Sequence, residues 1–517
     1  MSRPTEHVDT RNKRIAINTL MLYFRMLLTM GVSLYTVRVV LNTLGVEDYG
    51  IYNVVGGVVA LLAFLPSAMA SASQRFFSHA LGQADSGRLN QVFGVNVLIY
   101  AGMSMVAILA LETVGLWFVS GHLAVPDERH RAAVQLYHLA IVTFTLGIFK
   151  ASFMAIIIAH EDMKIYAYVA ISEALLKLGS VLALVVLPGD KIVIYGALIL
   201  AVAFVNTATY IIICSRRYSE CRLRNVRWEG GLAREIVGFT GWTLFGQLTT
   251  VARTQAITVL LNQFFNPTVV AARAIAMTVA TQSTMLAQNF NLGLYPPIIK
   301  AYAADQKDEM LSLIFSGSKI TFFLMWLVAL PMLLEMEAIL NLWLKEPPPY
   351  ATLFARLALI EVLINSVSNP LMTAARAPGR MGLYEGTLGT LQIGIFAASW
   401  MALRAGGGPS SVFFVAIAIN VLMLFVRLLI VRHLIGISVL TFLRRVIAPV
   451  MMVGVLSAGV CLVFQSFLLG GLLYSAAVIL GGSAFNAVVI YFLGLDRAWR
   501  EKIHSVVRAR FGRILFG

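Results

Sequence analysis

Long apolar runs recur along this chain and constrain its fold more than any other feature. Runs of about 18 or more apolar residues, the length that a membrane helix needs, follow one another through the whole sequence. Hydrophobic residues make up 59% of the 517 residues and charged residues only 13%, whereas an average soluble protein is about 25% charged. The sequence therefore predicts an all-α polytopic membrane protein.

We expect about fourteen transmembrane helices, separated by links that are too short to form an extramembrane catalytic domain. The chain is therefore not expected to be an enzyme. It contains no GxxxxGK[ST] phosphate-binding motif, so ATP hydrolysis is not expected to drive it. The predicted spans are 15–41, 51–80, 91–119, 132–159, 165–187, 191–213, 236–261, 267–297, 310–335, 350–376, 381–403, 409–432, 444–466 and 472–494.

The basic residues are unevenly divided between the two sides of the predicted membrane. The formal net charge is +15, and in a soluble protein such a balance would suggest nucleic acid. Here Lys and Arg concentrate in alternate links, above all in 214–235, and in the tail 495–517. The positive-inside rule then places both termini in the cytoplasm and makes a nucleic-acid partner unnecessary.

The three cysteines show no CxxC spacing and no neighbouring histidine cluster. This pattern argues against a disulfide framework or a metal site. No metal and no cofactor are expected.

The stretch VVLNTLGVEDYGIYNVV, residues 39–55, joins two apolar runs through a short acidic hinge. It is echoed about 220 residues later by VLLNQFFNPTVVAARAIA, residues 259–276. Two further matches, of 80–85 with 300–305 and of 154–168 with 372–386, have nearly the same offset. Because a six-helix unit returns the chain to its starting side, two such units are expected to be parallel repeats, related by a pseudo-twofold axis along the membrane normal.

The predicted organisation follows from this repeat. The tail behind the second repeat has apolar residues among basic ones, which is typical of a helix lying on anionic headgroups. The expected parts are a cytoplasmic tail at 1–14, a first lobe at 15–213, a basic linker at 214–235, a second lobe at 236–432, an extra helix pair at 444–494 and an amphipathic basic tail at 495–517.

The segment 18–55 resembles the opening of the polysaccharide-transport proteins, or oligosaccharide flippases, of the multidrug/oligosaccharidyl-lipid/polysaccharide exporter superfamily. The resemblance rests on an R…LGxxxYGxY pattern that starts at Arg38, on SASQRFFSHALGQAD at 71–85, and on the pair HEDMKIYA and PGRMGLYE. It covers the first twelve helices. It implies a two-lobed fold with a central cavity lined by helices 1, 2, 7 and 8.

The resemblance also implies a function. The expected substrate is an undecaprenyl-pyrophosphate-linked oligosaccharide, turned from the inner to the outer leaflet of the bacterial inner membrane by alternating access. Lipid-linked oligosaccharide and membrane lipids are then the expected partners, and glycan-assembly enzymes are candidate partners.

Ionisable residues inside the spans are the candidate site residues, because a charge in the bilayer usually faces a cavity or a partner. A lipid pyrophosphate needs cations that stay charged and bind phosphate, as arginine does. QNFNLGLYPP, at 288–297, is the densest polar stretch in any span and supplies amides for sugar hydroxyls. The predicted substrate-binding residues are Arg25, Arg38, Arg75, Lys150, Arg253, Arg273, Gln288, Asn289 and Asn291.

Structural roles compete with these assignments. Arg38 and Arg75 lie near helix ends and can extend to the headgroups. Glu173 and Lys177 form an i,i+4 pair that is more often structural. Glu361 can be neutralised by Arg356 or by another neighbour, and the amides can join helices rather than bind sugars.

Other functions also compete. A cation-coupled multidrug exporter of the same superfamily would want a carboxylate in the membrane that is free to bind a proton or sodium. A membrane glycan-assembly enzyme would want a large outer loop or clustered loop acids, which the sequence lacks. A scaffold for glycan assembly also remains an alternative.

Overall fold

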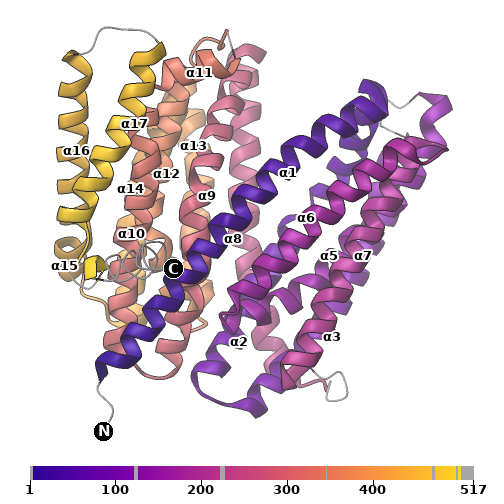
Figure 1. Cartoon of the computed structure of the whole chain (residues 1–517), viewed down its shortest axis with the longest axis horizontal. Helices are drawn as coiled ribbons and strands as arrows, with labels where there is room; N and C mark the ends of the chain where they lie inside the picture. The colour runs from indigo at the N-terminus through magenta and orange to yellow at the C-terminus, as the bar shows by residue number, and fades with distance from the viewer. Residues whose placement is uncertain are drawn as a thin grey trace, which may run out of the picture. The chain divides into compact units, whose positions relative to one another are not determined.

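A computed structural model describes residues 4–121, 126–221, 227–344, 346–467, 472–496 and 499–501. Over these residues the chain is helical throughout and contains no strand, so the predicted all-α class is confirmed (Figure 1). Most of the predicted amphipathic tail, and residues 222–226 of the predicted linker, lie outside the described residues.

The first half of the chain contains seven long or medium helices. They are α1 (Pro4–Ala60), α2 (Phe64–Gly82), α3 (Ser86–Ala110), α4 (Leu116–Gly121), α5 (Asp127–Ala159), α6 (Met163–Val186) and α7 (Lys191–Arg217). A π-helical turn, Leu111–Gly115, joins α3 to α4, and a short 3-10 turn, Ser219–Cys221, follows α7.

The second half continues with longer helices. They are α8 (Gly230–Phe264), α9 (Pro267–Ala303), α10 (Lys307–Leu334), α11 (Met336–Leu344), α12 (Ala351–Arg376), α13 (Met381–Arg404), α14 (Ser411–Ile435), α15 (Val439–Phe442), α16 (Ala448–Phe467) and α17 (Leu472–Val489). Two π-helical turns, Leu443–Ile447 and Ile490–Gly494, precede α16 and follow α17.

The chain divides into two compact units. Unit 1 comprises Met1–Arg14, Leu248–Ala301 and Gln306–Gly517, and unit 2 comprises Ile15–Gln247 and Tyr302–Asp305. The division falls within α8, between Gln247 and Leu248. The lobe boundaries expected from the sequence, with a linker at 214–235, stay a prediction.

Twelve helices in the described part of the chain are long and apolar enough to cross a membrane, and thirteen if a bent pair counts as one span. The chain is thus a multi-pass membrane protein, with fewer qualifying spans than the fourteen expected. The fourteenth expected span, 236–261, lies in α8, whose 35 residues give a length of about 52 Å. α8 does not qualify because of its polarity, since Gln247, Arg253 and Gln255 interrupt its apolar residues.

The predicted break in 39–55 occurs at Gly45. This residue has φ 77° and ψ 172°, outside the helical region, and glycine adopts such angles without a steric penalty. Asp48 follows the break and is only 9% exposed, because Arg129 of α5 binds its carboxylate. Arg129 also contacts Asp190, just before α7, at 3.0 Å. The acidic hinge is therefore tied to two other links of unit 2.

The second expected span is bent. Residues Asp48–Ala60 and Phe64–Gly82 meet at an angle of 43°. Pro66 lies in the first turn of α2 and has no N–H to donate to Leu62, so a continuous helix through this position would lose a hydrogen bond. The proline thus accounts for a break at Leu61–Ala63.

Matching turns support the repeat that the sequence predicts. The turn between α5 and α6 holds Glu161 at φ 63°, and the turn between α12 and α13 holds Gly379 at φ 81°. The following helices begin at Met163 and Met381, which are 218 residues apart. This is the offset that aligned 154–168 with 372–386.

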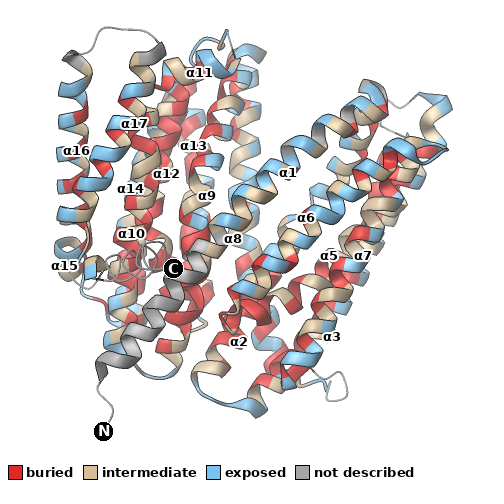
Figure 2. Ribbon diagram, in the orientation of Figure 1, coloured by how far each residue is buried: buried red, intermediate tan, exposed pale blue. Residues whose placement is uncertain are grey.

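Each unit has its own hydrophobic core. The core of unit 2 brings together α1, α5, α6 and α7, with members such as Val55, Ile141 and Leu184. The core of unit 1 joins α8 to α14, with members such as Leu261, Phe354 and Phe413. Helices α10 and α12 carry mainly buried residues, whereas α16 carries many exposed ones (Figure 2).

Polar bonds attach α16 and α17 to α10. Lys319 of α10 binds Asp496 at 2.6 Å, and Trp326 donates to the Ser457 hydroxyl at 2.8 Å. Glu335, at the end of α10, accepts hydrogen bonds from Gln465 at 3.0 Å and from Ser475 at 2.7 Å. The last helix pair is thereby fastened along the length of one helix of unit 1.

Replacing Gly115 by alanine is expected to destabilise the protein by about 1–3 kcal/mol through overpacking. A Cβ atom at Gly115 would overlap the hydroxyl of Tyr137. That hydroxyl is buried and donates to the carbonyl of Leu111 at 2.7 Å. Thermal unfolding in detergent measures the loss. Adding Tyr137→Phe should recover most of it because the overlapping atom is gone, and no recovery would contradict this packing.

Candidate functional site

An ion pair inside unit 1 joins two of its spans. The guanidinium of Arg253, on α8, lies 2.9 Å from the carboxylate of Glu361, on α12. Each side chain is only 12% exposed. Asn420 of α14 donates to the same glutamate oxygen at 3.1 Å. Three helices thus meet at one carboxylate.

A second arginine adds a positive charge to this group. Arg273 of α9 is 7% exposed and donates to the hydroxyl of Thr258, on α8. The charges of Arg253 and Glu361 both act on it. Two guanidinium groups and one carboxylate leave the group with a net charge of +1. We call Arg253, Arg273, Glu361 and Asn420 the Glu361 cluster.

A second glutamate of unit 1 is also outnumbered by arginines. Glu385 of α13 lies 3.9 Å from the guanidinium of Arg376, at the end of α12. The neighbouring Tyr384 is buried, and its ring lies 5.9 Å from the guanidinium carbon of Arg427, on α14. Arg427 also donates to the hydroxyl of Ser368. Here too, positive charge exceeds negative charge.

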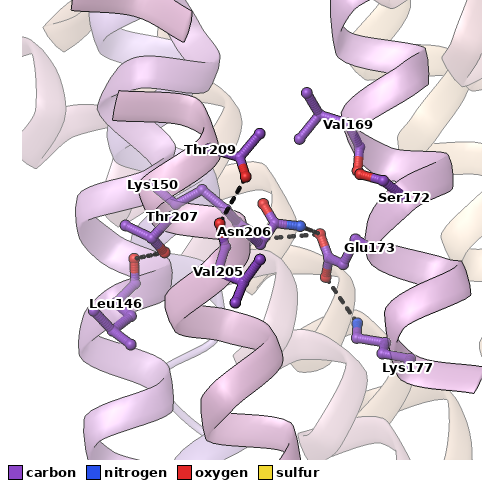
Figure 3. A network of polar contacts seen from close by, with 10 residues as sticks. All are labelled: Leu146, Lys150, Val169, Ser172, Glu173, Lys177, Val205, Asn206, Thr207 and Thr209. Atoms are coloured by element: carbon purple, nitrogen blue, oxygen red, sulfur yellow. Dashed lines mark hydrogen bonds and ion pairs between the residues drawn. The ribbon is translucent and has the colours of Figure 1, made fainter. Parts of the chain in front are cut away.

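The corresponding group in unit 2 surrounds Glu173 of α6 (Figure 3). Lys150 of α5 approaches one carboxylate oxygen at 3.3 Å, and Lys177, one helical turn further on α6, approaches the other at 2.8 Å. Asn206 of α7 donates to the oxygen that Lys150 binds. We call Lys150, Glu173, Lys177 and Asn206 the Glu173 cluster. The expected pair of Glu173 with Lys177 is confirmed, and Lys150 adds a contact between helices.

Arg25 of α1 lies beside the Glu173 cluster. Its guanidinium carbon is 4.8 Å from the centre of the Tyr166 ring on α6, a cation–π distance. Tyr210 of α7 is within electrostatic reach of Arg25, Tyr166 and Glu173. Two of the predicted site residues, Arg25 and Lys150, therefore belong to one cationic region of unit 2.

Arg75 and Arg38 occupy different surroundings. Arg75 of α2 is 4% exposed, stacks on Phe76 at 4.7 Å and pairs with Glu235 of α8 at 3.4 Å. It is therefore packed within unit 2 rather than extended toward headgroups. Arg38 of α1 is exposed.

The predicted amides mostly bond within their own helix. Gln288 is exposed and donates to the Thr284 hydroxyl at 3.1 Å. Asn289 and Asn291 donate to the carbonyls one turn earlier in α9, at 3.0 Å and 2.8 Å. Asn291 also accepts a hydrogen bond from Thr321 of α10, at 3.2 Å. The structure gives these amides local and interhelical partners, and their binding of sugar stays a prediction.

The structure thus groups Arg253 with Arg273, and Arg25 with Lys150, while Arg75 and Arg38 stand apart. Sequence reasoning did not identify Asn206 and Asn420 as members of the site. A signal was present, since both lie in the last helix of a repeat, 214 residues apart. It also suggested Arg356 as one partner for Glu361, but Arg356 donates to the carbonyl of Leu333 at 3.0 Å.

At one end of unit 2, polar groups outside the spans fasten the α5–α6 turn to the segment after α7. Asp162 accepts hydrogen bonds from Tyr218 at 2.6 Å and from Arg217 at 3.1 Å. Burial disfavours the charged carboxylate, but these bonds outweigh burial and lower the pKa of Asp162. The pKa of Glu220 is likewise lowered, since the bond from His160, at 2.6 Å, outweighs its burial.

This fastening predicts a loss of stability in acid. A carboxylate whose pKa is lower in the folded state stabilises the fold above its unfolded pKa, and that contribution is lost as the pH falls through the folded pKa. The loss should therefore lie below the ordinary values of 3.8 and 4.5 for Asp162 and Glu220. Thermal unfolding in detergent across this range measures it. The double variant Asp162→Asn, Glu220→Gln should show a flatter profile, and an unchanged profile would contradict this assignment.

Comparisons with known proteins show the fold. No family model matches the chain, and no curated protein sequence matches it. Solved structures do match. A MATE in its straight conformation has a TM-score of 0.67 at 14% identity, over 82% of this chain and 96% of that one.

Two further structures agree. A multidrug resistance MATE family transporter of the MOP superfamily, in an outward-facing conformation, has a TM-score of 0.65 at 14% identity, covering 81% of this chain and 95% of that chain. A MOP superfamily transporter from Pyrococcus furiosus Vc1, whose title describes a reversed polarity of its binding pocket, has a TM-score of 0.63 at 13% identity, again over 81% and 95%. The chain therefore has the fold of the MATE transporters.

Proposed function

We propose that this protein is a transporter that moves an undecaprenyl-pyrophosphate-linked oligosaccharide from the inner to the outer leaflet by alternating access. The observation that carries the proposal is the excess of positive charge around the glutamates of the spans. The Glu361 cluster has two arginines for one carboxylate, and the Glu173 cluster has two lysines for one carboxylate, with Arg25 beside it. Such sites suit an anion that must cross a layer of low dielectric constant.

The same observation weakens the alternative of a cation-coupled multidrug exporter. That function needs a carboxylate that is free to take up a proton or a metal cation. The four glutamates singled out in the spans all have a basic neighbour. Glu173, Glu361 and Glu385 pair as described, and Glu112 lies 3.0 Å from the ring nitrogen of His138.

The similar solved structures keep the multidrug function as the second candidate, since one of them is called a multidrug resistance transporter. All of the similar structures named above are transporters rather than enzymes, which favours transport over glycan-assembly chemistry. Another title relates a reversed pocket polarity to a different function. Charge within the fold is therefore the property that we use to choose between substrates.

The proposal includes a location and partners. The protein would lie in the bacterial inner membrane with both termini in the cytoplasm, as its basic links predict. Its partners would be the lipid-linked oligosaccharide, membrane lipids and enzymes that assemble the glycan.

Arg273 is the best position for a test. Its bonding partner, Thr258, is neutral, so Arg273→Ala leaves no carboxylate without its bonded cation. In cells that lack their own flippase, we expect this variant to lower surface glycan about tenfold or more, since a hydrogen bond to a charged group contributes about 1.5–3 kcal/mol. Arg273→Lys should retain part of the activity. Labelled surface glycan and the amount of protein in the membrane are measured together.

Arg404→Ala provides the matched control. Arg404 is an exposed arginine that stacks on Trp400 at the end of α13, outside the clusters. Its loss should leave glycan export unchanged. Full export by alanine variants of Arg25, Arg253 and Arg273 at normal protein levels would contradict the proposal. Drug resistance without glycan export would favour the multidrug exporter.

A further inference from the structure

A groove on unit 2 lies between α6 and α7, two helices that pack directly against each other. It has a volume of about 680 Å³. Its walls are apolar: α6 contributes Ile165, Tyr168 and Val169, and α7 contributes Ile212 and Ile213. The groove belongs to neither the Glu173 cluster nor the Glu361 cluster.

The apolar walls open toward the outside of the helix pair. Tyr168 is 62% exposed and Ile212 is 49% exposed, and both lie in membrane-spanning helices. In a bilayer such side chains face lipid chains, because the hydrocarbon layer is their only apolar surrounding outside the protein. A phospholipid is therefore the occupant that the position of this groove demands.

Two arginines close one end of the groove. Arg216 and Arg217, in the last turn of α7, complete its lining. Arg217 donates to Asp162 at 3.1 Å, which fixes its guanidinium beside the groove. Arg216 is exposed, and within the described ranges no side chain or carbonyl binds it. Its donors remain available to a ligand.

The surroundings of this end are also basic and amphipathic. Lys164, on α6, is exposed and lies one helical turn before Tyr168, on the same face. A tyrosine next to cations is typical of the depth at which headgroups begin. Between the ends of two membrane helices, basic pockets on the cytoplasmic side bind anionic headgroups.

We propose that this groove is a binding site for an anionic glycerophospholipid. The phosphate would accept hydrogen bonds from Arg216 and Arg217, and the upper part of one acyl chain would lie between Tyr168 and Ile212. From Ile165 to Val169, α6 rises about 6 Å, so the groove holds the region just below the headgroup and not a whole chain. On the predicted orientation, the lipid belongs to the cytoplasmic leaflet.

The test uses the purified full chain in detergent, titrated with phosphatidylglycerol or with phosphatidylcholine that has the same acyl chains. Bound lipid is counted by native mass spectrometry, and thermal unfolding gives a second measure. The wild type should bind phosphatidylglycerol more tightly than phosphatidylcholine. Arg216→Ala should weaken phosphatidylglycerol binding about fivefold, the loss expected from one cation at an anionic surface, and Arg216→Lys should keep most of the binding.

Two further variants separate the groove from general surface charge. Ile212→Trp fills the groove without changing charge, and should reduce binding of both lipids. Arg432→Ala is the matched control, because Arg432 is an exposed arginine in the last turn of α14 and does not line the groove. It should leave binding unchanged.

Several results would overturn the proposal. They are equal binding of the two lipids by the wild type, an Arg216→Ala variant that binds as the wild type does, or an equal loss in Arg432→Ala. Displacement of phosphatidylglycerol from this groove by a polyprenyl phosphate at much lower concentration would assign the groove to a different lipid. None of these outcomes bears on the glycan-export test, which rests on other residues.

Discussion

Arg253→Ala is expected to destabilise the protein by about 3–5 kcal/mol, because it leaves the carboxylate of Glu361 buried without its ion-pair partner. Both side chains are 12% exposed, so water can stabilise the remaining charge only poorly. Asn420 still donates one hydrogen bond to the carboxylate, but a neutral amide does not balance its charge. Thermal unfolding of the purified protein in detergent measures the loss.

A compensating variant separates folding from function at this site. Adding Glu361→Gln to Arg253→Ala removes the charge that was left unpaired, and should recover most of the lost stability. Glycan export should stay low in the double variant, because it still lacks a cation for the pyrophosphate. If Arg253→Ala alone unfolds at the wild-type temperature, the buried ion pair does not stabilise the protein. If the double variant exports glycan fully, Arg253 does not bind the substrate.

Glu173→Ala is expected to have the second largest effect, a loss of about 2–3 kcal/mol. The glutamate is the common acceptor for Lys150 of α5 and Asn206 of α7, so its removal leaves a cation and an amide without their acceptor (Figure 3). Hydrogen bonds that involve a charged group contribute about 1.5–3 kcal/mol, and partial exposure reduces the value here. The side chains of Glu173 and Lys150 are 23% and 27% exposed.

The other lysine of the cluster supplies the control for this prediction. Lys177 is 48% exposed and can turn toward the surroundings, so Lys177→Ala should change stability by no more than about 0.5 kcal/mol. The apolar pair Lys150→Met with Glu173→Leu should restore stability, since well-packed hydrophobic residues often replace a buried ion pair without loss. A large loss in Lys177→Ala, with little in Glu173→Ala, would contradict the arrangement around Glu173.

The predicted helices agree closely with the structure because each depends on a local property of the chain. The break at Gly45, the bend before Pro66 and the start of α6 at Met163 follow from glycine, proline and apolar run length. The one span that fails the apolarity criterion, α8, shows the limit of this reasoning. Its polar residues lower its hydropathy although it is long enough to cross a bilayer.

The candidate site was predicted less completely. Reading the spans identified which residues carry charge, and Arg253, Arg273, Arg25 and Lys150 do lie beside glutamates of the spans. It did not identify their neighbours. Glu361 was matched with Arg356, five residues away in the same helix, but it pairs with Arg253, 108 residues earlier in the chain.

The difference has a physical cause. Run length, proline, glycine and the distribution of Lys and Arg act over a few residues, so the amino-acid sequence alone was sufficient to establish a polytopic helical protein, its repeat offset and its excess of cations. The partner of a charge is set by the rotation of each helix about its axis and by the helices that pack beside it. Because each step along a helix turns the side chain by about 100°, contacts such as Glu361 with Arg253 and Asn420 became visible only once the helices were packed together.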